Sequence, residues 1–266
     1  MTTSSPADST KWFRRTGFSI DPKIRLVCFP HAGGTASFFQ SWSKHLPHET
    51  EVLAVRYPGR EDRLSETPIE RMEELSEAIA TSLGPLLDRP MMFFGHSMGA
   101  SIAHEVALRL EAQHSFKVQS LFLSGRAAPE RLATTDVTDL SDLELLEEVS
   151  ALGGTQAMVF EDPELRDLLL STIRADYRLL EKYKRVHRVK VMSPIFAYLG
   201  ESDKDVTFGD IRAWARWTRG SFGLRSFPGG HFYLIEQKIS LLTDISTYID
   251  RVARGTITPG LPQNGA

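Results

Sequence analysis

The chain has 266 residues, 41% of them hydrophobic and 24% charged, and a formal net charge of −3. This length suffices for one large domain with a substantial core, and the mildly acidic balance argues against nucleic acid as a partner. The polar N-terminal segment has no signal-peptide pattern, and no apolar run is long enough to span a bilayer. We therefore expect a cytoplasmic protein that binds neither membranes nor nucleic acid. The oligomeric state stays open, and a monomer is the simplest expectation.

Strands and helices alternate along most of the chain, which predicts an α/β fold with a mostly parallel sheet covered by helices on both faces. Apolar runs predict strands at 24–29 and 52–57, from 91, and at 118–124, 194–200 and 222–228. Helical spacing predicts helices at 68–87, 100–110, 140–152, 163–173, 175–183, 207–218 and 232–252. The tail at 256–266 has two prolines and two glycines, and we expect it to be disordered.

A glycine-rich turn, Pro30-His-Ala-Gly-Gly34, follows the first of these strands. Its glycines would let the backbone approach a reacting group closely. A mere turn is one interpretation. The other is a loop whose Ala32 N–H stabilises an oxyanion, because such a donor is supplied from a loop after an early strand.

The strand that begins at Met91 leads into the most specific motif of the chain. The apolar run ends in Gly95-His-Ser-Met-Gly99, and helical spacing continues from Ala100. Strand, sharp turn and helix in this order predict a nucleophile elbow, in which glycines avoid a clash between strand and helix. Ser97 would then stand above the sheet edge as the nucleophile. The Met98 N–H, at the helix start, would be the second oxyanion donor.

Between residues 127 and 190 the alternation breaks, and helices follow one another without a convincing strand. This insertion leaves the sheet at the same edge as Ser97, so we expect a helical lid over the site. A rigid helical subdomain without gating is the alternative. The apolar face of the lid is assigned to Leu143, Leu146, Val149, Met158, Phe160, Leu169 and Ile173.

A serine nucleophile needs a base, and in the fold of this elbow the base comes last along the chain. His187 and His231 are the histidines that lie well downstream of Ser97. His231 follows a strand and the turn at 229–230, a position from which it could reach the serine, whereas His187 lies in a basic connector. We therefore predict His231 as the base.

The base in turn needs an orienting carboxylate, which should follow the preceding strand of the sheet. Three carboxylates lie in the loop after the strand at 194–200. Asp203 is the predicted acid, Asp205 is the second candidate, and Glu201 is the third because it stands close to the strand end. Helix capping or a solvated turn accounts for the other two.

Six motifs stand in a fixed order between residues 12 and 249. They are Pro30-His-Ala-Gly-Gly34, Tyr57-Pro-Gly-Arg60, Gly95-His-Ser-Met-Gly99, Leu123-Ser-Gly-Arg126, Gly200-Glu-Ser-Asp203 and Gly229-Gly-His-Phe232. In this combination the chain resembles the type II thioesterases, the stand-alone editing enzymes of polyketide and nonribosomal peptide synthesis.

The resemblance implies an α/β-hydrolase fold with Ser97 as nucleophile, Asp203 as acid and His231 as base, and with the N–H groups of Ala32 and Met98 as oxyanion donors. It also implies that the substrates are acyl groups on the phosphopantetheine arm of acyl or peptidyl carrier proteins, from which stalled or aberrant units are removed. The acid loop departs slightly from the family pattern, since it reads Asp-Lys-Asp where relatives often have Asp-Pro. This departure keeps the second aspartate in contention.

No cluster of cysteine and histidine has metal-ligand spacing, so we expect neither a metal nor another cofactor. Another enzyme of the same fold, a small-molecule esterase or an acyltransferase, remains an alternative. A terminal cyclising thioesterase domain is disfavoured, because no carrier domain or linker precedes Trp12. A non-catalytic binding protein of this fold is the alternative from another class, and the complete set of triad and oxyanion residues argues against it.

Four arginines follow strand ends on the catalytic edge, and these are Arg56, Arg60, Arg63 and Arg126. They could recognise an acidic carrier protein near the entrance of the site. Pairing with the nearby acidic residues 61, 62 and 66 is an equally good interpretation.

Overall fold

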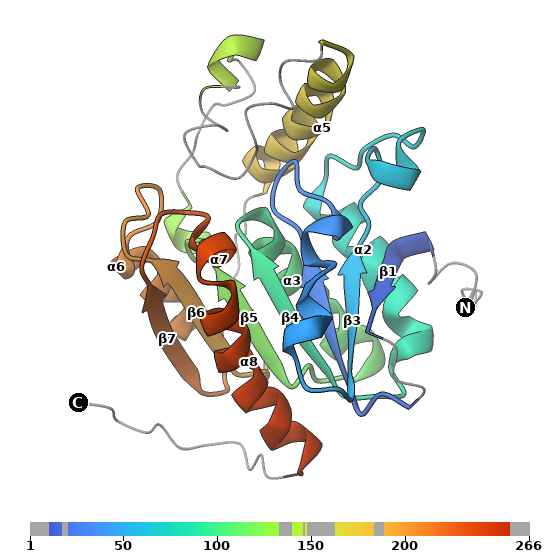
Figure 1. The fold of residues 1–266 in the computed structure, drawn as a ribbon, viewed down its shortest axis with the longest axis vertical. Helices are drawn as coiled ribbons and strands as arrows, with labels where there is room; N and C mark the ends of the chain where they lie inside the picture. Colours follow the sequence, from blue (N-terminus) through green and yellow to red (C-terminus); the bar gives the residue numbers. More distant parts are fainter. Residues whose placement is uncertain are drawn as a thin grey trace.

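The computed structural model describes residues 11–17, 21–132, 140–145, 147, 163–183 and 189–255, so the predicted tail lies outside it. Within these ranges seven strands form one sheet in the order β1-β3-β2-β4-β5-β6-β7 (Figure 1). The strands are β1 (Phe13–Thr16), β2 (Ile24–Phe29), β3 (Thr50–Val55), β4 (Met91–His96), β5 (Ser120–Ser124), β6 (Ile195–Gly200) and β7 (Phe222–Phe227). β1 runs antiparallel to β3, and the other neighbouring pairs are parallel.

The central strands end in register, which gathers the loops that follow them at one edge of the sheet. Phe29 at the end of β2 lies opposite Gly95 of β4. His96 at the end of β4 lies opposite Ser124 at the end of β5. β2, β3 and β4 are buried along their whole length, as is typical of parallel strands that are covered on both faces.

Helices cover both faces of the sheet (Figure 1). On one face lie α2 (Met72–Leu83), α3 (Met98–His114) and α6 (Phe208–Arg212), and on the other lie α7 (Tyr233–Glu236) and α8 (Lys238–Ala253). The short 3-10 helices in the described ranges are Ala36–Phe39, Trp42–His45, Glu61–Arg63, Gly84–Leu86, Pro129–Arg131 and Ala213–Arg216. The two faces have separate apolar cores, which the sheet divides.

The helix α5 (Pro163–Lys182) extends beyond the carboxyl edge of the sheet (Figure 1), and Leu179 near its end joins the apolar core on the face of α2 and α3. Its buried side chains recur at 170, 173, 176 and 179, the spacing of a helix that is covered on one side. We expected two helices here, at 163–173 and 175–183. The structure has one, because neither proline nor glycine interrupts the helix after Pro163.

The structure also differs from the sequence-based expectation at other places. The helix expected at 68–87 is α2 at 72–83, followed by the 3-10 turn at 84–86. β1 was not predicted; it is a four-residue edge strand, too short to show a clear alternation. The helix expected at 207–218 is a five-residue α6 followed by a 3-10 turn. The helix expected at 232–252 is divided at Gln237 into α7 and α8. None of these differences moves the loops at the carboxyl edge.

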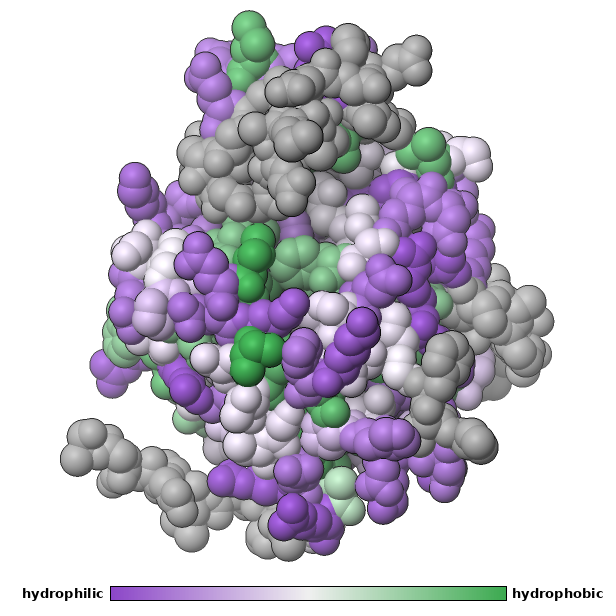
Figure 2. All heavy atoms as spheres, in the orientation of Figure 1, coloured by the Kyte–Doolittle hydropathy of each residue, from purple (hydrophilic) through white to green (hydrophobic). Residues whose placement is uncertain are grey.

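On the face shown in Figure 2, hydrophobic side chains are scattered among hydrophilic ones. Over the whole surface of the described residues, the exposed large apolar side chains are Leu64, Leu143, Val189, Met192, Phe208, Ile235 and Ile239. Single exposed apolar side chains are normal on a protein surface. Among the helices of the described ranges, none is long and apolar enough to cross a membrane.

Candidate active site

Ser97 stands at the tip of the predicted elbow, between the end of β4 and the start of α3. Its φ of 52° and ψ of −119° lie outside the regions that side chains other than glycine usually adopt. Its N–H donates to the Ser124 carbonyl oxygen over 2.8 Å, which ties the strained turn to β5. A strained serine at a strand-to-helix turn is the geometry of a nucleophile elbow.

The glycines on either side of the serine are required by close backbone contacts. A Cβ at Gly95 would lie 2.2 Å from the Gly99 carbonyl oxygen, and a Cβ at Gly99 would lie 2.1 Å from the Phe29 carbonyl oxygen. The second contact also brings the start of α3 against the loop that follows β2. The two loops that were expected to supply oxyanion donors are therefore neighbours.

Asp203 is the carboxylate that the fold brings to His231. Its Oδ2 lies 2.8 Å from His231 Nδ1, and its side chain is fully buried. Its Oδ1 accepts hydrogen bonds from the backbone N–H groups of Asp205 and Val206, over 3.0 and 3.2 Å. Asp205 and Glu201 are exposed, and Glu201 accepts from Ser226. Both oxygens of Asp203 are held, so its orientation toward the imidazole is fixed.

The loops that carry the acid and the histidine touch through a glycine at the end of β6. A Cβ at Gly200 would lie 2.1 Å from the Gly230 carbonyl oxygen, and the Ser202 N–H donates to the Gly229 carbonyl oxygen over 2.8 Å. At the end of β5, a Cβ at Gly125 would lie 3.3 Å from Cε1 of His231. The imidazole is therefore packed directly against the backbone of the neighbouring strand end.

Two further buried histidines surround the expected base. The rings of His96 and His231 are 5.0 Å apart, and those of His31 and His96 are 6.0 Å apart. His96 Nδ1 lies 2.9 Å from Ser124 Oγ, which lies 2.8 Å from the Tyr233 hydroxyl. Burial lowers the pKa of His31 to about 3 and the pKa of His96 well below its ordinary value. His231 therefore faces neutral rings that add no positive charge beside it.

His31 and His96 were not predicted as members of this cluster, although each lies within one of the two motifs. Their position next to the two motif loops was the available signal. His31 Nδ1 and His96 Nε2 have no hydrogen-bond partner among the described residues.

The loop after β2, which carries the expected donor Ala32, forms a tight turn. Its turn is closed by a hydrogen bond of 2.9 Å from the Gly34 N–H to the His31 carbonyl oxygen, and Gly33 has a φ of 71°. In the part of the chain that the structure describes, the N–H groups of Ala32 and Met98 donate to no other residue. Both donors are thus available for an oxygen that develops charge beside Ser97.

The arginines on the catalytic edge are mostly paired inside the protein. Arg56 pairs with Asp62, and Arg63 pairs with Glu66 over 2.8 Å. The hydrogen bonds from Arg63 are the first cause that lowers the pKa of Glu66 to about 2. For these two arginines the interpretation as internal pairs is the one that the structure supports.

The other two arginines of the edge, Arg60 and Arg126, have partners that differ from those predicted. Arg60 forms a buried ion pair with Asp176 of α5, at 2.7 Å between Nη2 and Oδ1. Arg126 donates from Nε to Ser101 Oγ over 3.0 Å, and among the described residues no carboxylate pairs with it. Burial lowers the pKa of Arg126 to about 10. The pairing of Arg60 with α5 was not foreseen, since 116 residues separate the two side chains.

The lid residues fall into three groups. Leu169 and Ile173 of α5 pack with Leu145 and Leu170 in a small apolar cluster. Leu143 does not belong to the apolar face, because its side chain is 74% exposed while Leu145 of the same short helix turns inward. The remaining candidates lie outside the described residues or have no described side chain, and these are Leu146, Val149, Met158 and Phe160.

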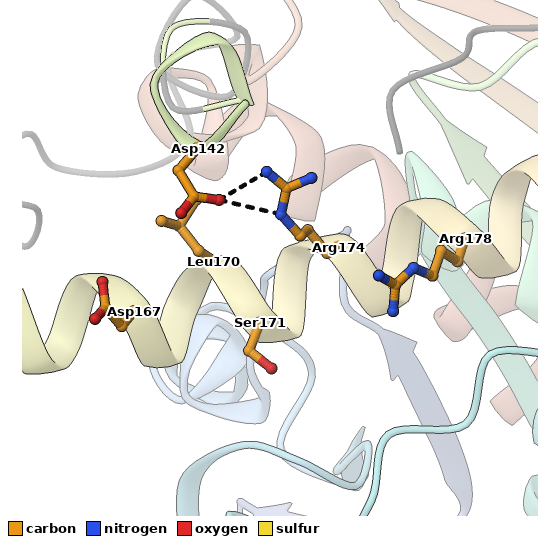
Figure 3. A pocket seen from close by; sticks show the side chains of 6 residues that line it. All are labelled: Asp142, Asp167, Leu170, Ser171, Arg174 and Arg178. Carbon is orange, nitrogen blue, oxygen red and sulfur yellow. Dashed lines mark hydrogen bonds and ion pairs between the residues drawn. The ribbon is translucent and has the colours of Figure 1, made fainter. Parts of the chain in front are cut away.

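A pocket lies along α5, next to the segment that carries Asp142 (Figure 3). Asp142 accepts from Arg174 there, and the remaining lining residues are Asp167, Leu170, Ser171 and Arg178. None of the five residues expected to act in catalysis lines it. The pocket therefore carries no part of the expected chemistry.

Comparisons with known proteins agree with this geometry. A model of the thioesterase domain family matches residues 24–249. Thioesterase PikA5 of Streptomyces venezuelae is 39% identical over 249 residues, which cover 93% of this chain and 88% of that protein. Gramicidin S biosynthesis protein GrsT of Aneurinibacillus migulanus is 36% identical over 233 residues, or 87% of this chain and 91% of that one.

Solved structures show the same architecture. The type II thioesterase BorB from the borrelidin biosynthetic cluster has a TM-score of 0.82 and 40% identity, over 90% of this chain and 97% of its own. The thioesterase RedJ from the prodiginine pathway of Streptomyces coelicolor has a TM-score of 0.81 and 37% identity, over 85% and 91%. These neighbours confirm the predicted α/β-hydrolase class.

Proposed function

The chain belongs to the thioesterase family, and we propose that it releases acyl groups from the phosphopantetheine arms of carrier proteins, with Ser97, His231 and Asp203 as its catalytic triad. The family match confirms the resemblance that the six motifs indicated, and it makes the protein a hydrolase of thioesters. The observation that carries the assignment of residues is the buried Asp203–His231 hydrogen bond, at the sheet edge where Ser97 forms the elbow.

Acylation would begin with attack of Ser97 Oγ on the thioester carbonyl carbon. Asp203 engages His231 Nδ1, which leaves Nε2 to accept the serine proton. The charge that develops on the carbonyl oxygen would be stabilised by the N–H groups of Ala32 and Met98. The tetrahedral intermediate then collapses, the carbon–sulfur bond breaks, and the proton on His231 leaves with the thiol of the arm.

Deacylation would repeat these steps with water as the nucleophile. His231 takes a proton from water while the hydroxide adds to the acyl-serine, and the same two N–H groups hold the oxyanion. Ser97 then leaves as the alcohol and recovers its proton from His231. The products are a free carboxylic acid and a carrier protein whose arm ends in a thiol.

The biological role proposed here is editing in polyketide or nonribosomal peptide synthesis. The relatives that share most of the chain include a gramicidin S biosynthesis protein and a type II thioesterase from the borrelidin cluster. An enzyme of this kind removes stalled or aberrant acyl units so that the carrier can be loaded again. The cytoplasm is the location that we predict for it.

The function can be tested with a panel of acylated carrier proteins. Mass spectrometry before and after incubation should show conversion of acyl-carrier to the free thiol form by the wild-type protein and not by Ser97→Ala. Each acyl group should also be offered as an oxygen ester of the same chain length. Faster turnover of the esters than of the thioesters would support the esterase alternative and contradict our proposal.

A further inference from the structure

One side of α5 contacts the loop that carries the Ala32 N–H, the proposed oxyanion donor. Thr172 Oγ1 donates to the Gly59 carbonyl oxygen over 3.1 Å. A Cβ at Gly33 would lie 2.8 Å from Cγ1 of Ile173, so the helix touches the loop backbone. Asp176, one turn further along the helix, accepts a hydrogen bond of 2.7 Å from the Gly33 N–H. Three side chains on one side of α5 thus contact the loops after β2 and β3.

Asp176 is itself fixed by a buried arginine. Arg60 donates from Nη1 to Oδ2 over 2.8 Å and from Nη2 to Oδ1 over 2.7 Å, a bidentate arrangement. The two side chains are 6% and 5% exposed. Arg60 also donates to the Gly34 carbonyl oxygen over 3.2 Å. The pair therefore forms hydrogen bonds with two backbone groups of the turn, the Gly33 N–H and the Gly34 carbonyl group.

These contacts determine how the peptide groups of the turn are oriented. The Gly33 N–H belongs to the peptide group that directly follows Ala32, and the hydrogen bond to Asp176 fixes the plane of that group. The hydrogen bond from the Gly34 N–H to the His31 carbonyl oxygen holds the peptide group that carries the Ala32 N–H itself. With this peptide group held by the turn and the next one held by Asp176, the Ala32 N–H has little freedom to rotate.

We propose that Asp176, held by Arg60, is a positioning residue that aims the Ala32 N–H at the oxyanion, so that α5 is a fixed wall of the active site as well as a cover for it. This inference rests on the proposed function, because it takes Ala32 as an oxyanion donor. A misaimed donor weakens binding of the transition state more than binding of the substrate. The pair should therefore act on kcat rather than on KM.

The test compares three variants of the pair with a matched control. Asp176→Ala removes all three hydrogen bonds that Asp176 accepts from Gly33 and Arg60, and Asp176→Asn keeps an oxygen that can accept from Gly33. The double variant Arg60→Met with Asp176→Leu leaves no buried charge unpaired, so its stability should recover. Glu70→Gln is the control, because it breaks two exposed contacts between α5 and the body, to Arg178 and Lys182.

We expect kcat of Asp176→Ala to fall by about 10- to 100-fold, less than the loss of a whole oxyanion donor, with KM changed by less than about threefold. Asp176→Asn should lose less than Asp176→Ala. The double variant should stay as slow as Asp176→Ala despite its recovered stability, and Glu70→Gln should match the wild type. Affinity for a boronic acid that forms a tetrahedral adduct with Ser97 should fall by the same factor as kcat.

Two results would overturn the proposal. One is a kcat of folded Asp176→Ala that equals that of Glu70→Gln. The other is recovery of kcat together with stability in the double variant, which would make the pair purely structural. Failure of the proposed function looks different, since wild-type protein would then leave all acyl-carriers intact. The rate at which a fluorophosphonate modifies Ser97 would still compare the variants in that case, because it needs the oxyanion donors and no thioester.

Discussion

The two proposed oxyanion donors are held in place by different means. The Met98 N–H lies at the start of α3, and close contacts at Gly95 and Gly99 fix that position within a few residues of the motif. The Ala32 N–H lies on a loop whose next peptide group is bonded to Asp176, 143 residues further along the chain. The first donor is thus positioned by local structure, and the second by a local turn together with a tertiary contact.

Substitutions near the two donors should therefore differ in how they affect folding and activity. A side chain added at Gly95 or Gly99 acts through steric clash and should damage fold and activity together. A change at the contact between α5 and the loop leaves the strands and the elbow in place, so it can reduce activity in a folded protein. Inserted segments that pack on a catalytic loop can therefore tune the rate without taking part in the chemistry.

The largest loss of activity is expected at Ser97, the proposed nucleophile, because without its attack no oxyanion forms for the two donors to stabilise. Ser97→Ala should lower kcat by at least about 10³-fold without unfolding the protein, because the triad supplies most of the acceleration beyond binding. His231→Ala should lose a comparable amount, and the double variant little more, since the two residues act as a unit. Steady-state kinetics with thermal unfolding curves check both points. Losses that multiply would mean that the two side chains do not act together.

The next effect separates the two aspartates of the acid loop. Asp203→Asn should lower kcat by roughly 10³- to 10⁴-fold, because an amide cannot stabilise the protonated His231. Asp205→Asn should change kcat by less than about threefold, since Asp205 is exposed and contributes its backbone N–H to Asp203. Both variants should be assayed with one acyl-carrier substrate. A greater loss in Asp205→Asn would refute the assignment of Asp203.

The strand ends and their motifs could be predicted from the sequence because local rules determine them. The strand expected at 24–29 agrees with β2, and the acid expected at Asp203 pairs with His231. A buried parallel strand is a continuous apolar run, and a sharp turn next to it needs glycine. Such patterns lie within ten residues of one another and can be read directly.

The contact between α5 and the loop could not be predicted, because nothing local marks it. Arg60 lies in a recognised motif, but its neighbours Glu61 and Asp62 offered nearer acidic partners. The choice of Asp176 follows from the insertion folding back over the sheet edge, which only the tertiary structure shows. The prediction that Leu143 lies on the apolar face was also wrong, because the sequence of a one-turn helix does not show which side faces inward.

A smaller effect tests whether the elbow depends on local packing as the comparison requires. Gly99→Ala places a methyl group 2.1 Å from the Phe29 carbonyl oxygen, so the strand and helix must separate. We expect a loss of about 1–3 kcal/mol or more in the free energy of unfolding, as for other overpacked sites. Gly84→Ala is the matched control, because the nearest atom to its Cβ would be 3.8 Å away. Equal stability of the two variants in urea would show that the elbow tolerates the added atom.

The smallest effect concerns the loop itself and depends on pH. His31 lies in the Ala32 turn, and burial, followed by the nearby His231 and Arg60, lowers its pKa to about 3. The unfolded chain binds a proton on this residue near pH 6.5, whereas the folded loop stays unprotonated until about pH 3. Folding therefore loses stability as the pH falls below 6.5. The slope contributed by one such group is up to ~1.4 kcal/mol per pH unit.

This slope can be isolated by comparing His31→Gln with His45→Gln, since His45 is exposed. Urea unfolding between pH 4.5 and 7.5 should give a shallower loss of stability for His31→Gln than for the wild type, and no change of slope for His45→Gln. His96 is present in all three proteins, and burial is the first cause that lowers its pKa, so its main contribution cancels in the difference. Because the slope depends on the burial of His31, it reports whether the rings of Phe38, His96 and Phe232 keep the imidazole covered. Identical slopes in the three proteins would mean that His31 is open to solvent. That result would contradict the claim that tertiary packing holds the turn in place.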